Sequence, residues 1–207
     1  MSDLNSKQIH ILQVAETLFA ERGFDGTSIR DISKVAKINI AMVSYYFGSK
    51  ERLLESLVFY RTSDLKIQLA NLTKEHFSPL EKINKLIELY IAKIHGNKYI
   101  YQILHLESFF KKRELNFKSF TEIKKANLES LKAIIEEGQT QGIFRKNINI
   151  PLIAPTIFGT YVHFQMSKPF FGDILNLKTE LEYDTYIKTE LTAHIQQTIN
   201  ALLLYEV

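Results

Sequence analysis

Apolar residues recur every three or four positions along most of the chain, which is the spacing of one face of an α-helix. The first such stripe runs through residues 6–22 and ends before Gly23, with Asn5 and Ser6 as candidate N-caps. Alternation with a period of two is scarce, and no repeat or low-complexity segment is present. The pattern therefore predicts an all-α fold.

Three short helical segments follow the first one. In the second helix, Ser28 and Asp31 have the spacing of a capping box, and the expected buried face is Ile29, Ile32, Val35 and Ala36. Asn39 is the expected cap of a third helix, which Gly48 ends. Ser49 is the expected cap of a fourth, with an inner face of Leu53, Leu54 and Leu57. Two short helices joined at residues 37–39 have helix-turn-helix spacing over residues 28–47. An ordinary helical hairpin has a similar spacing, so the spacing alone leaves that alternative open.

The remaining helical segments are longer. They are expected over residues 79–96, 98–113, 116–138, 151–168 and 183–204. The prediction is thus an N-terminal helix-turn-helix, three-helix domain at residues 1–54, followed by a larger helical domain at residues 55–207.

The third helix has an unusual polarity. Val43 and Phe47 are one turn apart and are expected to pack against Ile32 and Val35. The outward side then carries Ile40, Ala41, Ser44 and Tyr45, without Lys or Glu. A solvated helix normally carries charge on its outer face, whereas a helix that enters the major groove of DNA gains from small side chains and methyl groups.

Positive charge is concentrated around the same helices. The whole chain has a formal net charge of +3, and residues 28–52 contain five basic and two acidic residues, which also gives +3. Thr27 and Ser28 precede the second helix, and Ser49 and Lys50 begin the fourth. Free N–H groups at helix N-termini suit phosphate oxygens, so these residues are candidate contacts to a DNA backbone.

Composition and motifs argue against other classes of function. The 207 residues are 45% hydrophobic and 24% charged, as in soluble globular proteins, and contain no cysteine. We expect a cytoplasmic protein without a signal peptide or membrane span. Paired catalytic carboxylates, a Gly-rich phosphate loop and an activated nucleophile are not evident, so no enzyme activity and no cofactor are expected. His105 and His163 lack HxxxH or HxxE spacing, so no metal site is expected.

Residues 11–54 resemble the TetR family of bacterial transcriptional regulators. The motifs that match are Leu18-Phe19 with Gly23-Phe24, the run Thr27 to Ile32, and Tyr46-Phe47 followed by Lys50-Glu51. The sequence departs from the family pattern where Lys37 replaces a common turn glycine, Ala41 a common glycine, and Ser44 a common tyrosine. These departures bear on the operator sequence rather than on DNA binding itself.

The resemblance implies that residues 1–54 form a DNA-binding domain and residues 55–207 a ligand-binding and dimerisation domain. It implies a ligand-responsive homodimer, most often a repressor, that binds a palindromic operator in double-stranded DNA and is released by a small apolar or amphipathic effector. A protein of the same fold with no effector is the alternative. The implied DNA contacts are Thr27, Ser28, Arg30, Asn39, Ile40, Ala41, Ser44, Tyr45 and Lys50. Tyr46 is a further candidate for DNA contact, with packing between helices as an open alternative.

The C-terminal segments carry many aromatic residues with polar edges. Candidate ligand-binding residues are Tyr90, Tyr101, His105, Phe109, Phe120, Phe158 and Tyr161. Such residues suit an apolar pocket with a few hydrogen-bonding groups, although helix-bundle core is the alternative for each of them. The family resemblance implies a dimer interface formed by the last two long helices, at about residues 151–168 and 184–205.

Overall fold

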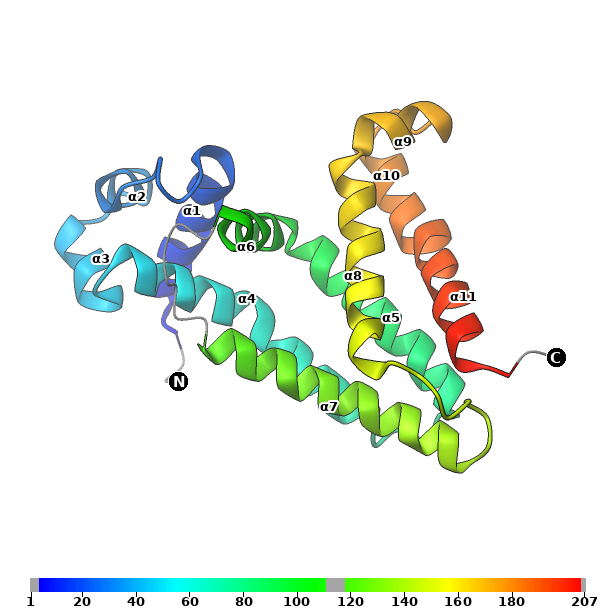
Figure 1. Cartoon of the computed structure of the whole chain (residues 1–207). Coiled ribbons are helices and arrows are strands. Elements are labelled where there is room, and N and C mark those ends of the chain that lie inside the picture. The colour runs from blue at the N-terminus through cyan, green and yellow to red at the C-terminus, as the bar shows by residue number, and fades with distance from the viewer. Residues whose placement is uncertain (1–3, 111–117, 206–207) are drawn as a thin grey trace. The chain divides into compact units, whose positions relative to one another are not determined.

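The computed structural model describes residues 4–110 and 118–205, and side chains are described for these residues except 105–110. The predicted all-α class is confirmed (Figure 1), because no strand occurs in the described residues and the only bridge joins Phe144 and Leu204. The helices are α1 (Ser6–Arg22), α2 (Ile29–Val35), α3 (Ile40–Phe47), α4 (Lys50–Leu72), α5 (Pro79–Gly96), α6 (Lys98–Phe110), α7 (Lys118–Thr140), α8 (Ile150–Met166), α9 (Lys168–Ile174), α10 (Glu180–Tyr186), the π-helix η1 (Ile187–Leu191) and α11 (Thr192–Leu203).

The chain forms two compact units. The N-terminal unit comprises Met1–Ser63 and Asn97–Glu122, and the C-terminal unit comprises Asp64–Gly96 and Ile123–Val207. Helices α4 and α7 each cross from one unit to the other along the chain. This division into two units reflects which residues pack together, not which function they serve. The functional division expected near residue 54 falls inside α4 and stays a prediction.

The N-terminal unit is built around α1, which packs against α2 and α6 (Figure 1). Its core contains residues from α1, α2, α3, α4 and α6, including Phe19, Ile32, Leu53 and Ile100, which are nearly or fully inaccessible to solvent. Residues 97–104 thus complete the core on which α2 and α3 are held. Burial of each large apolar side chain stabilises such a core by about 1.5–3 kcal/mol.

The expected caps of the first three helices are confirmed. The side chain of Asn5 accepts a hydrogen bond from the N–H of Gln8 at 2.9 Å, and Ser28 and Asp31 form the predicted capping box of α2. The hydroxyl of Ser28 also donates to the Asp31 carboxylate, and these bonds lower the pKa of Asp31. The short helix α2 is therefore held at its start by its own side chains.

The expected buried face of α2 is wrong at one position. Ile32 and Ala36 are buried and Ile29 is half-buried, but Val35 is 52% exposed. At about 100° per residue, Ile29 and Ala36 both lie on one side of Ile32, whereas Val35 lies on the other. The buried arc of this helix therefore excludes Val35, which faces solvent with Lys34.

Two other elements differ from the expected ones. The fourth helix is long rather than short, because its pattern of buried residues continues from Leu53 to Leu72. The short helix α9 was not expected, because Pro169 was expected to end the preceding helix. Proline fits the first turn of a helix, where its missing N–H has no intrahelical partner, so Pro169 begins a new helix instead.

Candidate functional site

Helix α3 is fixed at both ends and on its inner face. The Asn39 side chain accepts a hydrogen bond from the N–H of Ala41 at 2.8 Å, and Gly48 ends the helix with φ of +77°. Val43 and Phe47 are 1% and 6% exposed, as predicted for the residues that attach α3 to the core. Because the positive φ favours glycine, the turn into α4 depends on Gly48.

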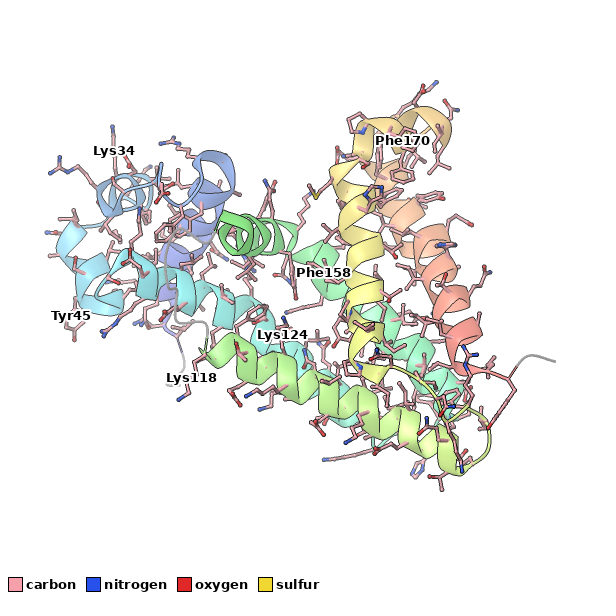
Figure 2. The ribbon with its side chains drawn as sticks, in the orientation of Figure 1. Lys34, Tyr45, Lys118, Lys124, Phe158 and Phe170 are labelled. Carbon is pink, nitrogen blue, oxygen red and sulfur yellow. The ribbon has the colours of Figure 1, made fainter. Side chains whose placement is uncertain are left out.

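The outer face of α3 carries no charged side chain. Its residues Ile40, Ala41, Ser44 and Tyr45 are all exposed, as predicted, and so is the cap Asn39. Tyr45 is 85% exposed and lies at the outer side of α3 in Figure 2. A face of one amide, one hydroxyl, one phenol and small apolar groups offers contacts to base edges without a charge that must be desolvated.

Tyr46 points toward the core. It is half-buried and packs against the core cluster of the N-terminal unit, together with Tyr60, Tyr101 and Phe120. Its ring makes edge contacts with the rings of Tyr45 at 5.4 Å and Phe47 at 6.4 Å between centroids. Tyr46 therefore supports the position of Tyr45, while any direct contact of Tyr46 with DNA stays a prediction.

Thr27 lies inside the fold. Its side chain is buried, and its hydroxyl lies 2.9 Å from the carbonyl oxygen of Gly23 and 3.1 Å from that of Leu18. A hydroxyl has one proton to donate, and both acceptors near it belong to the end of α1 and the loop after it. The structure thus leaves no side-chain surface for the phosphate contact expected of Thr27, whereas Ser28 is exposed as part of its capping box.

Lys50 joins α4 to the loop before α2. Its Nζ donates to the carbonyl oxygens of Phe24 and Thr27, each at 2.8 Å, and lies 4.3 Å from the centroid of the Phe24 ring. Two of the three ammonium donors are therefore used within the fold. At most the third N–H donor of Lys50 remains for the predicted phosphate contact.

Other cations near α3 are exposed. Arg30, Lys34, Lys37 and Arg52 are all exposed, and no ion pair is found for them within the part of the chain that the structure describes. Lys37 has a φ of +55°, in the turn where the family commonly has glycine. The exposed positive charge predicted for residues 28–52 is thus present beside the uncharged face of α3.

The candidate ligand residues are not gathered at one place. Tyr101 and Phe120 pack against the core of the N-terminal unit, whereas Tyr90, Phe158 and Tyr161 belong to the C-terminal unit. His105 and Phe109 lie outside the residues whose side chains are described. Burial raises the pKa of Tyr90 and that of Tyr161 to about 12, so both phenols stay protonated near neutral pH.

A chain of hydrogen bonds links three helices of the C-terminal unit. Nδ1 of His95 lies 3.0 Å from the hydroxyl of Tyr161, which also accepts from the side chain of Gln165 at 3.0 Å. Nε2 of His95 lies 3.0 Å from a carboxylate oxygen of Asp184. These bonds connect the end of α5 with α8 and α10, so Tyr161 is a structural residue of this unit.

The C-terminal unit also contains a pocket of about 550 Å³, between α8, α9 and the helices that follow. Its lining comprises Gly159, Thr160, His163, Phe164, Phe171, Ile174, Leu175, Tyr186, Leu191 and His194. We call it the α8–α9 pocket. The rings of Phe164 and Tyr186 stack here with centroids 5.5 Å apart. Its His163 and Phe164 belong to the aromatic residues with polar edges that suggested such a pocket, whereas none of the candidate ligand-binding residues with a described side chain lines it.

Among the residues that the structure describes, no group of three His, Asp or Glu side chains is placed to hold a metal ion. Within the same part of the chain, no helix has the length and apolar character needed to cross a membrane.

Comparison with known proteins finds two family descriptions that match this chain. Residues 11–57, which contain α2 and α3, match the family described as "Bacterial regulatory proteins, tetR family". Residues 79–199 match the "Tetracyclin repressor-like, C-terminal domain", which covers more than half of the chain. The chain belongs to the TetR family. It is a bacterial regulatory protein of this family, whose members generally act as dimers on DNA operators.

Relatives in this family are similar over most of the chain. The transcriptional repressor NicS of Pseudomonas putida is 30% identical over 150 residues, covering 68% of this chain and 67% of NicS. The fatty acid metabolism regulator protein of Bacillus subtilis is 26% identical, covering 77% of this chain and 82% of its own. A tetR-family regulatory protein from Rhodococcus RHA1 has the same fold, with a TM-score of 0.77 at 14% identity, covering 98% of this chain and all of the other.

Proposed function

We propose that this TetR-family protein binds a palindromic operator as a homodimer and places α3 of each protomer in the major groove. The observation that carries the proposal is the exposed, uncharged outer face of α3 beside exposed cations. Asn39, Ser44 and Tyr45 offer polar groups to base edges, and Ile40 and Ala41 offer apolar contacts to thymine methyl groups. Arg30 and Ser28 lie at the start of α2, where they meet the DNA backbone.

The proposed dimer forms through α8 and α11. Like α3, these helices contain no Asp, Glu, Lys or Arg. The exposed positions of α8 nevertheless recur at helical spacing, at Leu152, Pro155, Gly159, His163 and Met166. An exposed helix face of this kind is typical of a protein interface rather than of a solvated surface.

The proposed effector is an apolar or amphipathic small molecule. The α8–α9 pocket supports this class, because its wall is mostly aromatic and aliphatic with a few polar groups, and its size suits a small ligand. The name of the relative that regulates fatty acid metabolism points to an acyl chain as the first compound to test. Under this proposal, the effector weakens operator binding by favouring a conformation with lower affinity for DNA.

The direct test is a mobility-shift titration with the DNA upstream of the protein's own gene, with and without palmitate or palmitoyl-CoA. We expect a complex at low salt that either acyl compound dissociates. Leu175→Trp, which fills the α8–α9 pocket, should remove the response to the effector, whereas Leu181→Trp at a position that is 76% exposed should keep it. Binding that no acyl compound affects would favour the alternative of a regulator with a different effector or none.

A further inference from the structure

A groove of about 450 Å³ continues from the outer face of α3 within the N-terminal unit. It is lined by Ser44, Tyr45, Tyr46, Phe47 and Gly48, by Arg52, Glu55, Ser56 and Val58 of α4, and by Ser119 and Phe120 of α7. We call it the α3–α4 groove. Because Ser44 and Tyr45 belong both to this groove and to the exposed face of α3, a duplex that contacts this face also approaches the groove.

Arg52 lies across the turn between α3 and α4. Its Nη1 and Cδ lie 3.6 and 3.7 Å from the position that a Cβ at Gly48 would occupy, so the absence of a side chain at Gly48 gives the guanidinium room beside the end of α3. Arg52 is exposed, and within the described residues its guanidinium forms no hydrogen bond or ion pair. Lys50 and Arg61 differ from it, because both have partners inside the fold.

The groove contains groups that suit a sugar–phosphate backbone. A guanidinium binds phosphate through a pair of parallel N–H donors, and hydroxyl groups are common further contacts. The hydroxyls of Ser44 and Ser119 form no hydrogen bond among the described residues, whereas that of Ser56 donates to the carbonyl oxygen of Arg52 at 2.8 Å. The groove thus offers one cation and two hydroxyls next to an aromatic wall.

One carboxylate opposes an anion in this groove. Glu55 is half-buried, and no ion pair is found for it in the described part of the chain. Its charge repels a phosphate, so a phosphate is best placed at the rim beside Arg52 rather than deep in the groove. This arrangement makes the effect of Glu55 on DNA binding opposite in sign to that of Arg52.

We infer that the α3–α4 groove receives the DNA backbone next to the base pairs contacted by α3, and that Arg52 binds one phosphate there while Glu55 weakens that contact. This inference rests on the proposed DNA-binding function. It adds Arg52, which neither the sequence pattern nor the family resemblance assigned, to the phosphate contacts. A purely structural alternative is that Arg52 only stabilises the C-terminal end of α3, where a cation is favourable.

The test is the salt dependence of operator affinity for Arg52→Gln, Arg52→Lys and Glu55→Gln. Affinity for DNA falls as salt rises, and each lost phosphate contact reduces the magnitude of the slope of log K against log salt by about one. Arg52→Gln should therefore reduce that magnitude by about two per dimer. Arg52→Lys should keep most of the slope, and Glu55→Gln should raise the affinity. Lys66→Gln, an exposed cation about 21 Å further along α4, is the matched control and should leave the slope unchanged.

The outcomes separate the inference from the proposed function. Arg52→Gln with the wild-type slope overturns the phosphate contact, and a lower melting temperature in that variant then assigns Arg52 to the end of α3. A Glu55→Gln variant that binds no more tightly than wild type contradicts the position proposed for the phosphate. Absence of operator binding by the wild-type protein itself overturns the proposed function instead.

Discussion

At the scale of single residues, the side chains near α3 divide into those that hold it and those that remain exposed. Thr27, Lys50 and Tyr46 lie in the region that resembles the family motif, yet each makes contacts inside the N-terminal unit. Arg30, Tyr45 and Arg52 are exposed and have polar groups for a partner. A motif position therefore indicates that a residue matters for DNA binding, but its packing decides whether it acts by contact or by support.

Lys50→Met should destabilise the protein. The substitution removes a charged donor from the carbonyl groups of Phe24 and Thr27, and hydrogen bonds from charged groups contribute about 1.5–3 kcal/mol. We therefore expect a loss of about 1–3 kcal/mol in the free energy of unfolding, measured by chemical denaturation. Lys66→Met, at an exposed position of α4, should be close to neutral.

The operator affinity of the same variant tests the predicted phosphate contact. If Lys50 only stabilises the fold, the Lys50→Met variant, kept folded at low temperature, should bind the operator with the same salt slope as the wild-type protein. A slope lower by about two per dimer would show that the third ammonium donor reaches a phosphate.

At the scale of helices, polar side chains stabilise elements that apolar packing alone leaves weakly held. These side chains are the helix caps and the hydrogen-bonded residues of the C-terminal unit. Helix α2 has seven residues, which is too short to be stable alone, and its capping box gives it a fixed start. Helices α5, α8 and α10 meet at His95, Tyr161 and Asp184. Both features predict measurable effects of single substitutions.

Asp31→Asn should weaken α2 in a pH-dependent way. The pKa of Asp31 is lowered in the folded protein, chiefly by the hydrogen bond from the Ser28 hydroxyl. Its stabilising effect is therefore present above the unfolded pKa of about 3.9 and is lost as pH falls through the lower folded value. Thermal unfolding should show a lower melting temperature for Asp31→Asn at pH 7 and a smaller difference below about pH 3. An equal difference at both pH values would contradict this role of the ionised carboxylate.

Tyr161→Phe should destabilise the C-terminal unit. The hydroxyl of Tyr161 meets both His95 and Gln165, and its removal leaves partly buried polar groups without a partner, which costs about 1–3 kcal/mol. Tyr186→Phe is the control, because its ring stacks on Phe164 and no hydrogen bond of its hydroxyl is found among the described residues. Denaturant unfolding of the two variants measures the difference, and equal stabilities would show that the chain of bonds contributes little.

Much of this arrangement of helices follows from local sequence, and some of it does not. Helical spacing and capping residues predicted α1, α3 and α5, together with the outward face of α3. The exposure of Val35 and the length of α4 depend on packing against neighbours that are distant in the sequence, and α9 begins at Pro169, which was expected to end a helix. Aromatic character alone does not show which residues pack together, so the seven candidate ligand residues fell in two units and none of those with a described side chain lines the α8–α9 pocket.

At the scale of the whole molecule, the proposed function requires two copies of the chain. A palindromic operator presents two half-sites, and a single protomer can occupy only one of them. The proposed interface lies on α8 and α11, helices that like α3 have no charged residue. Gly159 lies within the exposed stripe of α8, and an added Cβ there meets no atom within 4 Å in the protomer.

Gly159→Arg therefore distinguishes an effect on the fold of one protomer from an effect on the dimer. Within one protomer the substitution should raise helix stability by up to about 1 kcal/mol, because glycine is a poor helix former and the space is open. In a dimer formed through α8, the same side chain places a charge in an uncharged interface, where its desolvation is unfavourable. We expect sedimentation to show a folded monomer with much weaker operator binding, whereas Ala133→Arg, on an exposed position of α7, should remain a dimer with wild-type affinity. A Gly159→Arg protein that stays dimeric and binds its operator would place the interface on a different surface, and the uncharged stripe of α8 would then need another explanation.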